Sequence, residues 1–225
     1  MEPTIYKPSI YKGAGIYKVG AEGGAGGEPG VIIPPNYEQY KYLQFKNGND
    51  FIRISAAFTG DYIYDVIFCD DLDYDGGSEK IVFYSSYSGD ISISCINDKF
   101  SPSFRIYGNN GGNVTKRIFV DFTKIRNDFF NVVLNKNKTF VNGNPGEQDV
   151  VYNARNYTYL MLGYSDARFC LTGKIGRLIV KNGTEKKYYF VPAFGINENK
   201  PGMYDFINDI FYPVYNNNGS IICTD

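Results

Sequence analysis

The side chains best suited to catalysis are scarce in this chain of 225 residues, and histidine is absent altogether. Without an imidazole the chain cannot build a Ser-His-Asp or Cys-His mechanism or an imidazole metal site. It also lacks the one side chain whose unperturbed pKa lies near neutrality. The composition therefore excludes most familiar hydrolase mechanisms.

The cysteines offer little alternative chemistry. None of them shows the Cys-x-x-Cys spacing of a zinc or redox site, and they stand at Cys69, Cys95, Cys170 and Cys223. Cys95 is in phase with Ile91 and Ile93, which favours a small core residue over a metal ligand.

One acidic cluster has the spacing of a possible cation site. Between Asp70 and Gly77, aspartates alternate with other residues before a glycine pair, as in calcium loops whose oxygen ligands converge on one ion. Counting Asp71 as position one, however, the twelfth residue is Val82, where an EF-hand places a bidentate glutamate. No flanking helix is predicted. The sequence favours a solvated acidic turn, with calcium binding as the alternative.

The elements that would position these residues are strands. From about residue 37 the chain shows short apolar alternations, clearest from Asp90 to Ile96. Turn dipeptides such as Asn142-Gly143 and Asn182-Gly183 separate them. No segment has a convincing helical period. Residues 37–225 are therefore predicted to form an all-β antiparallel sandwich, with a barrel as the main alternative.

The first 36 residues differ from the rest. Residues 1–20 contain three Ile-Tyr-Lys triplets, which are Ile5, Tyr6, Lys7, Ile10, Tyr11, Lys12, Ile16, Tyr17 and Lys18. Short apolar and aromatic repeats cannot enclose a core, but in extended form they can dock onto another protein, so we expect an extended anchor that binds a partner. Residues 21–36 are a linker rich in Gly and Pro. The alternative is a disordered leader without a partner.

The charge balance limits the partners further. Lys and Arg number 23 against 24 Asp and Glu, a formal charge of -1, so no broad basic field would hold a nucleic acid. No apolar run approaches the roughly 18 residues of a spanning helix. Residues Met1 to Thr4 lack the start of a secretory signal peptide. We expect no nucleic acid, no membrane insertion and no export.

Several stretches of the second half resemble a known superfamily. They are the strand Phe130 to Leu134, the strand and Asn-Gly turn Lys138 to Gly143, the stretch Leu160 to Tyr164, and the Phe-x-x-x-Gly-x-Ile pattern Phe169 to Ile175. In this order they resemble the concanavalin A-like lectin/glucanase superfamily in its laminin-G-like form. The resemblance covers residues 37–195 in outline and implies a jelly-roll β-sandwich.

The closing segment resembles a second group. Pro192-Ala193, followed by Gly202-x-Tyr-Asp and by Asn208 to Tyr212, is similar to the last segment of many phage and prophage virion proteins, where it caps a concanavalin-like sandwich. In this setting Asp205 is expected to form a turn rather than to catalyse. The resemblance implies a head- or tail-fibre-like appendage that attaches by its amino terminus and assembles as a homotrimer.

Glycosidases of the lectin/glucanase superfamily usually carry Glu-x-Asp-x-x-Glu along one strand, so that one carboxylate attacks and another donates a proton. The chain has no such run. Its isolated glutamates, expected to be solvated surface charges, are Glu79, Glu147, Glu185 and Glu198. We therefore expect no enzyme and no catalytic, cofactor-binding or metal-binding residues.

Together these features predict a non-enzymatic phage virion structural protein, made in the bacterial host cytoplasm. The anchor would bind capsid or tail proteins, and the lectin-like domain would adhere to host-surface glycans. Two alternatives stay open. One is a structural decoration or spacer without a ligand, and the other is a polysaccharide hydrolase that uses carboxylates alone.

The acidic cluster gives a direct test. If Asp70 to Asp75 form a solvated turn, a chelator leaves the melting temperature of the protein unchanged, because no bound cation stabilises the folded state. Thermal melting in EDTA and in excess calcium measures this. A rise in melting temperature with calcium would instead establish a cation loop.

Overall fold

The computed structural model describes residues 33–46, 50–59, 62–70, 79–85, 91–96, 103–108, 115–119, 129–135, 138–145, 156–163, 172–215 and 218–225. These residues contain nineteen strands and no helix. The strands are β1 (Tyr37–Gln39), β2 (Tyr42–Lys46), β3 (Ile52–Ile54), β4 (Phe58–Thr59), β5 (Ile63–Asp70), β6 (Glu79–Ser85), β7 (Ile91–Ile96), β8 (Ser103–Gly108), β9 (Thr115–Phe119), β10 (Phe130–Asn135), β11 (Lys138–Val141), β12 (Asn144–Pro145), β13 (Asn156–Tyr157), β14 (Leu160–Leu162), β15 (Thr172–Asn182), β16 (Glu185–Gly195), β17 (Lys200–Asp205), β18 (Ile210–Pro213) and β19 (Ile221–Thr224).

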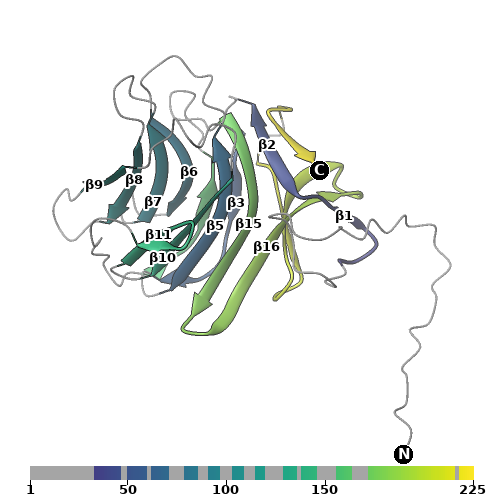
Figure 1. The fold of residues 1–225 in the computed structure, drawn as a ribbon. Helices are drawn as coiled ribbons and strands as arrows, with labels where there is room; N and C mark the ends of the chain where they lie inside the picture. Colours follow the sequence, from purple (N-terminus) through teal and green to yellow (C-terminus); the bar gives the residue numbers. More distant parts are fainter. Residues whose placement is uncertain are drawn as a thin grey trace, which may run out of the picture.

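The strands form two main antiparallel sheets that pack face to face (Figure 1). The larger sheet has 11 strands, with the path β12-β11-β10-β5-β15-β16-β17-β18 and with β1, β2 and β19 attached beside it. The smaller sheet has six strands in the order β3-β14-β6-β7-β8-β9, and β13 pairs with β4 separately. An isolated bridge between Ile52 and Val214 joins the two main sheets at one corner. The predicted all-β antiparallel sandwich is confirmed.

Alternating side chains of both sheets fill the space between them. In the central strand β5, Tyr64, Val66 and Phe68 are almost fully buried and point into this core. The smaller sheet contributes Ile54 and Leu160 from the opposite side. Burial of each such side chain is worth about 1.5–3 kcal/mol, so the period-two pattern itself stabilises the sandwich. The opposite face of the larger sheet, which points away from this core, is called the outer face below.

The larger sheet splits between β15 and β16. Strand β5 runs along one side of β15, while the other side of β15 pairs first with β2, from Thr172 to Ile175, and then with β16, from Leu178 onward. A bulge separates Ile175 from Leu178 at this point. Beyond the split, β16 pairs with β1 at residues 193–195. The chain from β1 to β2 thus fills the gap between the two diverging strands.

Three strands near the carboxyl terminus, β17, β18 and β19, are not among those predicted from the sequence. Pro201-Gly202 and Pro213 indicate turns there, yet they lie within strands. Pro213 is tolerated because β18 lies at the end of the sheet path. Gly202 is required because a Cβ at this position would meet the Tyr212 carbonyl oxygen and the Phe211 ring.

One predicted turn is confirmed in detail. Asn142 and Gly143, which connect β11 to β12, both have positive φ, at 50° and 77°. This is the backbone of a type I′ hairpin turn, for which Asn-Gly is the favoured sequence. Within the described residues, no helix is long and apolar enough to cross a membrane.

Candidate functional site

The residues that the sequence assigns to docking, between Ile5 and Lys18, lie outside the described residues, as do residues 71–78 of the acidic cluster. The described part of the chain contains no group of three or more acidic or cysteine side chains placed to hold a metal ion. Glu185 and Glu198 are exposed, as predicted, and Glu185 Oε1 lies 2.6 Å from Lys187 Nζ. The site must therefore be sought on the faces of the sheets.

The first candidate is the place where the chain enters the sandwich. Residues 33–46, called the entry segment here, run across the outer face and into the split of the larger sheet (Figure 1). Ile33 is buried in a second apolar cluster on this face, with Ile179, Tyr189, Val191, Ala193 and Tyr204. The Tyr37 ring lies 5.0 Å from the rings of both Tyr204 and Phe211.

Backbone hydrogen bonds hold the entry segment in the same position. Ile196 N donates to Asn36 O at 2.9 Å, and Tyr40 N donates to Pro192 O at 3.0 Å. Lys46 N donates to Ser220 O at 2.7 Å. The segment therefore contacts both β16 and the carboxyl-terminal part of the chain.

Asp205 follows Tyr204, a member of the second apolar cluster, and is fully buried. Its Oδ1 accepts hydrogen bonds from Tyr189 N and Ile207 N, each at 3.0 Å, and its Oδ2 accepts one from Asn208 Nδ2 at 2.6 Å. The prediction that Asp205 forms a turn is confirmed. The neighbouring Tyr204 hydroxyl donates to Asp209, and burial, with this hydrogen bond, raises the pKa of Tyr204 above its ordinary value.

A second buried carboxylate, Asp50, fastens the carboxyl-terminal segment. Its two oxygens accept hydrogen bonds from Asn218 N and Ser220 N, both at 3.0 Å. Burial alone would raise the pKa of Asp50, but these hydrogen bonds stabilise the anion and hold the pKa below its ordinary value. Asp50 therefore acts in the folded state as an anion that orders residues 218–220.

The third buried carboxylate, Asp65, lies on the outer face of β5. Asn131 Nδ2 donates to its Oδ1 at 2.6 Å, Arg177 Nη1 lies 3.3 Å from Oδ1, and Lys181 Nζ lies 3.9 Å from Oδ2. Asp65 thus faces two cations and one amide. Each of the three buried carboxylates is therefore held by hydrogen-bond donors or by cations.

More cations follow along β15 and β16. Because of the bulge, Ile175 and Leu178 both point into the main core, although they are three residues apart. Lys174, Arg177 and Lys181 therefore all lie on the outer face. Lys186 of β16 is the direct cross-strand partner of Lys181. These four residues are called the basic row below.

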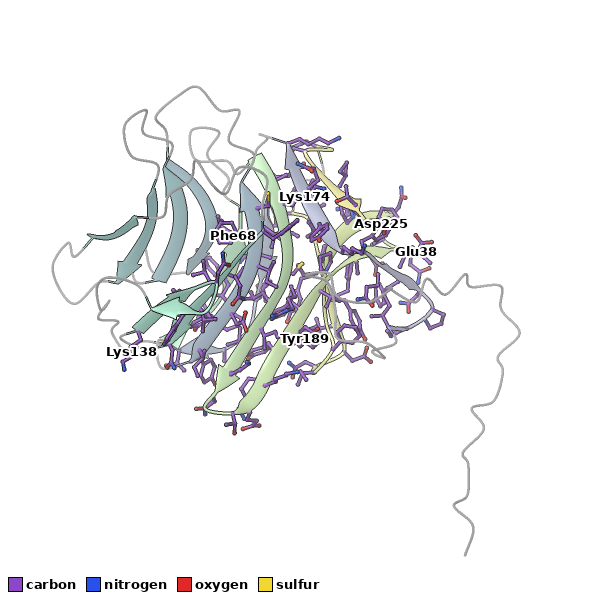
Figure 2. The ribbon with its side chains drawn as sticks, viewed as in Figure 1. Glu38, Phe68, Lys138, Lys174, Tyr189 and Asp225 are labelled. Carbon is purple, nitrogen blue, oxygen red and sulfur yellow. The ribbon has the colours of Figure 1, made fainter. Side chains whose placement is uncertain are left out.

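Aromatic rings accompany the basic row at both ends. Lys174 Nζ lies 5.4 Å from the centre of the Tyr42 ring, which stacks on Phe129 at 4.2 Å. Lys186 Nζ lies 5.2 Å from the centre of the Tyr189 ring. Figure 2 shows Lys174 and Tyr189 far apart along the larger sheet. The outer face therefore combines cations with aromatic carbon.

The thiol of Cys223 is unsuited to nucleophilic chemistry. Cys223 Sγ donates to Ala193 O at 3.4 Å, and burial raises the pKa of this thiol to about 12. Because the thiolate is the reactive form, Cys223 is inert near neutral pH.

The comparisons with known proteins identify no family. No protein-family profile and no curated protein sequence matches the chain. Among solved structures, the chain is similar to a native heptameric SAP-like pentraxin from Limulus polyphemus, with a TM-score of 0.44 and 12% identity over 63% of this chain and 76% of that one. This likeness concerns the outline of the fold and says nothing about function.

Sequence reasoning missed the basic row, although its residues are visible in the sequence. Strict alternation from Lys174 would place Arg177 and Lys181 on the core face, because each is an odd number of residues away. Only the bulge brings all three onto one face. Gly173 and Gly176, on either side of Lys174 and Ile175, are the signals that could have indicated an irregular strand.

The Asp50 contacts predict a pH-dependent stability. At pH 7, Asp50→Asn should lower the free energy of unfolding by about 2 kcal/mol, because hydrogen bonds to a charged group are lost. The pKa of Asp50 is lower in the folded than in the unfolded state, so this stabilisation is present above the unfolded pKa and is lost as the pH falls through the folded one.

Urea denaturation of both proteins at pH 7 and at pH 3 measures this effect. The difference between wild type and variant should shrink at the lower pH. A difference that stays constant with pH would show that Asp50 does not act through its charge.

Proposed function

We propose that this chain is a non-enzymatic structural protein of a phage virion, a fibre or appendage that attaches by its amino terminus and displays a lectin-like domain for adhesion to host-surface glycans. The observation that carries the proposal is the entry segment. It fastens the amino-terminal side of the chain to β16, while β7, β8 and β9 lie on the opposite side of the molecule (Figure 1). Such an arrangement suits a domain that is held through one segment of the chain and displayed from there.

The closing segment supports the same proposal. Of the residues that resemble the last segment of phage virion proteins, Pro192 and Ala193 lie in β16, and the others form the strands β17 and β18 and the turn between them, on which the entry segment packs. Asp205, Asn208 and Tyr204 of this segment are engaged in hydrogen bonds that hold the turn. The motif is therefore accounted for as a structural support for the entry segment.

The described carboxylates favour a holding role over catalysis. A glycosidase needs one carboxyl group to give a proton and another to attack or to activate water. Asp50 and Asp205 are instead bound to backbone N–H groups, and Asp65 faces Arg177 and Lys181. A structural spacer without a ligand is the second candidate, because the same fastening would serve it equally well.

Assembly as a homotrimer is part of the proposal. Closed cyclic assemblies suit an appendage that is repeated on a particle. Several linked copies would also raise a weak affinity for glycans to a useful avidity, because later contacts form within one assembly.

Deletion of residues 1–20 tests the attachment. We expect the truncated protein to fold with an unchanged melting temperature, because the entry segment from Ile33 onward is retained, but to be absent from purified particles. Immunoblots of particles from cells that make either the full chain or the truncated chain measure this. A variant in which Ile5, Tyr6 and Lys7 alone are replaced by Gly-Ser-Gly is the graded control and should give partial loss.

Normal incorporation of the truncated chain would refute the assignment of residues 1–20 as the anchor. The ligand is tested separately, by probing an array of host surface polysaccharides with the full chain. Binding supports adhesion, whereas silence across the array would favour the spacer.

A further inference from the structure

We propose that the outer face of the larger sheet, along the basic row, binds an anionic glycan, meaning a polysaccharide that carries carboxylate or phosphate groups. This inference rests on the proposed adhesive function, because it names the ligand class and the face of the displayed domain. Its residues are Lys174, Arg177, Lys181 and Lys186, with the Tyr42–Phe129 pair at one end.

The first observation is an excess of positive charge on one strand face. Asp65 is shared between Arg177 and Lys181, so one carboxylate faces two cations. Lys186, the cross-strand partner of Lys181, adds a fourth cation to the same face, and its Nζ lies 5.2 Å from the centre of the Tyr189 ring.

The second observation is an unsatisfied donor at Arg177. Its Nη1 is buried and makes no hydrogen bond, although it lies 3.3 Å from Asp65 Oδ1. That oxygen instead accepts a short hydrogen bond from Asn131. Nη1 is therefore held beside Asp65 by charge attraction without a hydrogen bond, and Arg177 shares this carboxylate with Lys181. The Arg177 side chain as a whole is 23% exposed, so part of it lies at the surface, although Nη1 itself does not.

The third observation is the shape of the surface. At about 3.3 Å per residue, Lys174 and Lys181 lie about 23 Å apart along β15, with Arg177 between them. The cations therefore stand in single file, as repeated charges along a polysaccharide would require. At the Lys174 end, the half-buried Tyr42 and Phe129 rings stack on each other and offer apolar area for the carbon face of a sugar ring.

A glycan fits these observations better than a nucleic acid does. The chain has a formal charge of -1, and nucleic-acid binding draws on a broad basic field that neutralises many phosphates. An acidic peptide would meet the same cations but would make no use of the aromatic pair. Both are included below as competitors.

The test is binding of the full chain to defined probes at low salt, measured by isothermal titration calorimetry. The carboxylate probe is an oligogalacturonate, and the neutral control is the same oligosaccharide fully methyl-esterified. The phosphate probe is poly(glycerol phosphate). We expect at least one anionic probe to bind, the esterified control to bind at least tenfold more weakly, and the affinity to fall as salt is raised.

Variants locate the site. Lys174→Gln and Lys181→Gln should each weaken binding of the anionic probe by about tenfold, because each loses a charge-assisted contact. Lys138→Gln is the matched control. Lys138 is exposed on β11, away from Lys174 and Tyr189 in Figure 2, and its replacement should leave binding unchanged. Melting temperatures confirm that all three variants fold. Arg177→Lys keeps the charge beside Asp65 and should weaken binding through the lost guanidinium geometry.

Three results would overturn the inference. The first is that neither anionic probe binds. The second is that Lys138→Gln weakens binding as much as Lys174→Gln and Lys181→Gln do. The third is that polyglutamate or single-stranded DNA binds as tightly as the anionic glycan, which would indicate unspecific charge attraction. Binding of neutral host glycans without anionic ones would remove this inference and leave the adhesive function standing. If no glycan binds, both this inference and the proposed adhesive function are wrong. The incorporation experiment would still test the anchor.

Discussion

The divergence of β15 and β16 is the constraint on which the rest of this structure depends. Two neighbouring strands that separate leave backbone N–H and C=O groups facing the gap, and such groups must find partners when they are buried. Here β2 pairs with the exposed side of β15, and β1 pairs with the exposed side of β16. The entry segment is thus a structural requirement of the sheet. Its position in turn explains the second apolar cluster, because Ile33 and Tyr37 can be buried only where this segment crosses the outer face.

The same region determines what the outer face presents. The bulge between Ile175 and Leu178 accompanies the change of partner from β2 to β16, and it also changes which side chains of β15 point outward. Without it, Arg177 and Lys181 would share the core face with Ile175. One local irregularity therefore produces both the place where the chain is fastened and the row of cations proposed to contact a glycan. Attachment and adhesion would then depend on one element, at different points along it.

The sequence was sufficient for the architecture and for several details. Period-two alternation and Asn-Gly turns predict an antiparallel all-β sandwich, since both follow from local chemistry, and Asn142-Gly143 adopts the expected backbone. Asp205 could be recognised as a turn former because short side chains that accept hydrogen bonds from nearby backbone groups are common in turns. Its bond to Tyr189 N, sixteen residues away, could not be foreseen.

What escaped prediction depends on contacts between distant parts of the chain. By local rules Pro201-Gly202 indicates a turn, yet these residues pair with β16 as part of a strand. Glycine is needed at position 202 because a Cβ there would collide with the Phe211 ring. The basic row escaped for a related reason, because a bulge is defined by pairing with a neighbouring strand. Asp65 gains its partners from β10 and β15, which lie far from it in sequence.

The central claim is that the entry segment unfolds only with the sandwich, so that a docked amino terminus holds the whole domain. Native-state hydrogen exchange of the full chain tests this most directly. The amide protons of Tyr40 and Ile196, which bond to Pro192 and Asn36, should exchange as slowly as those of the central strand β5, through global unfolding. Much faster exchange at Tyr40 and Ile196 than in β5 would show that the segment opens by itself and would contradict the account.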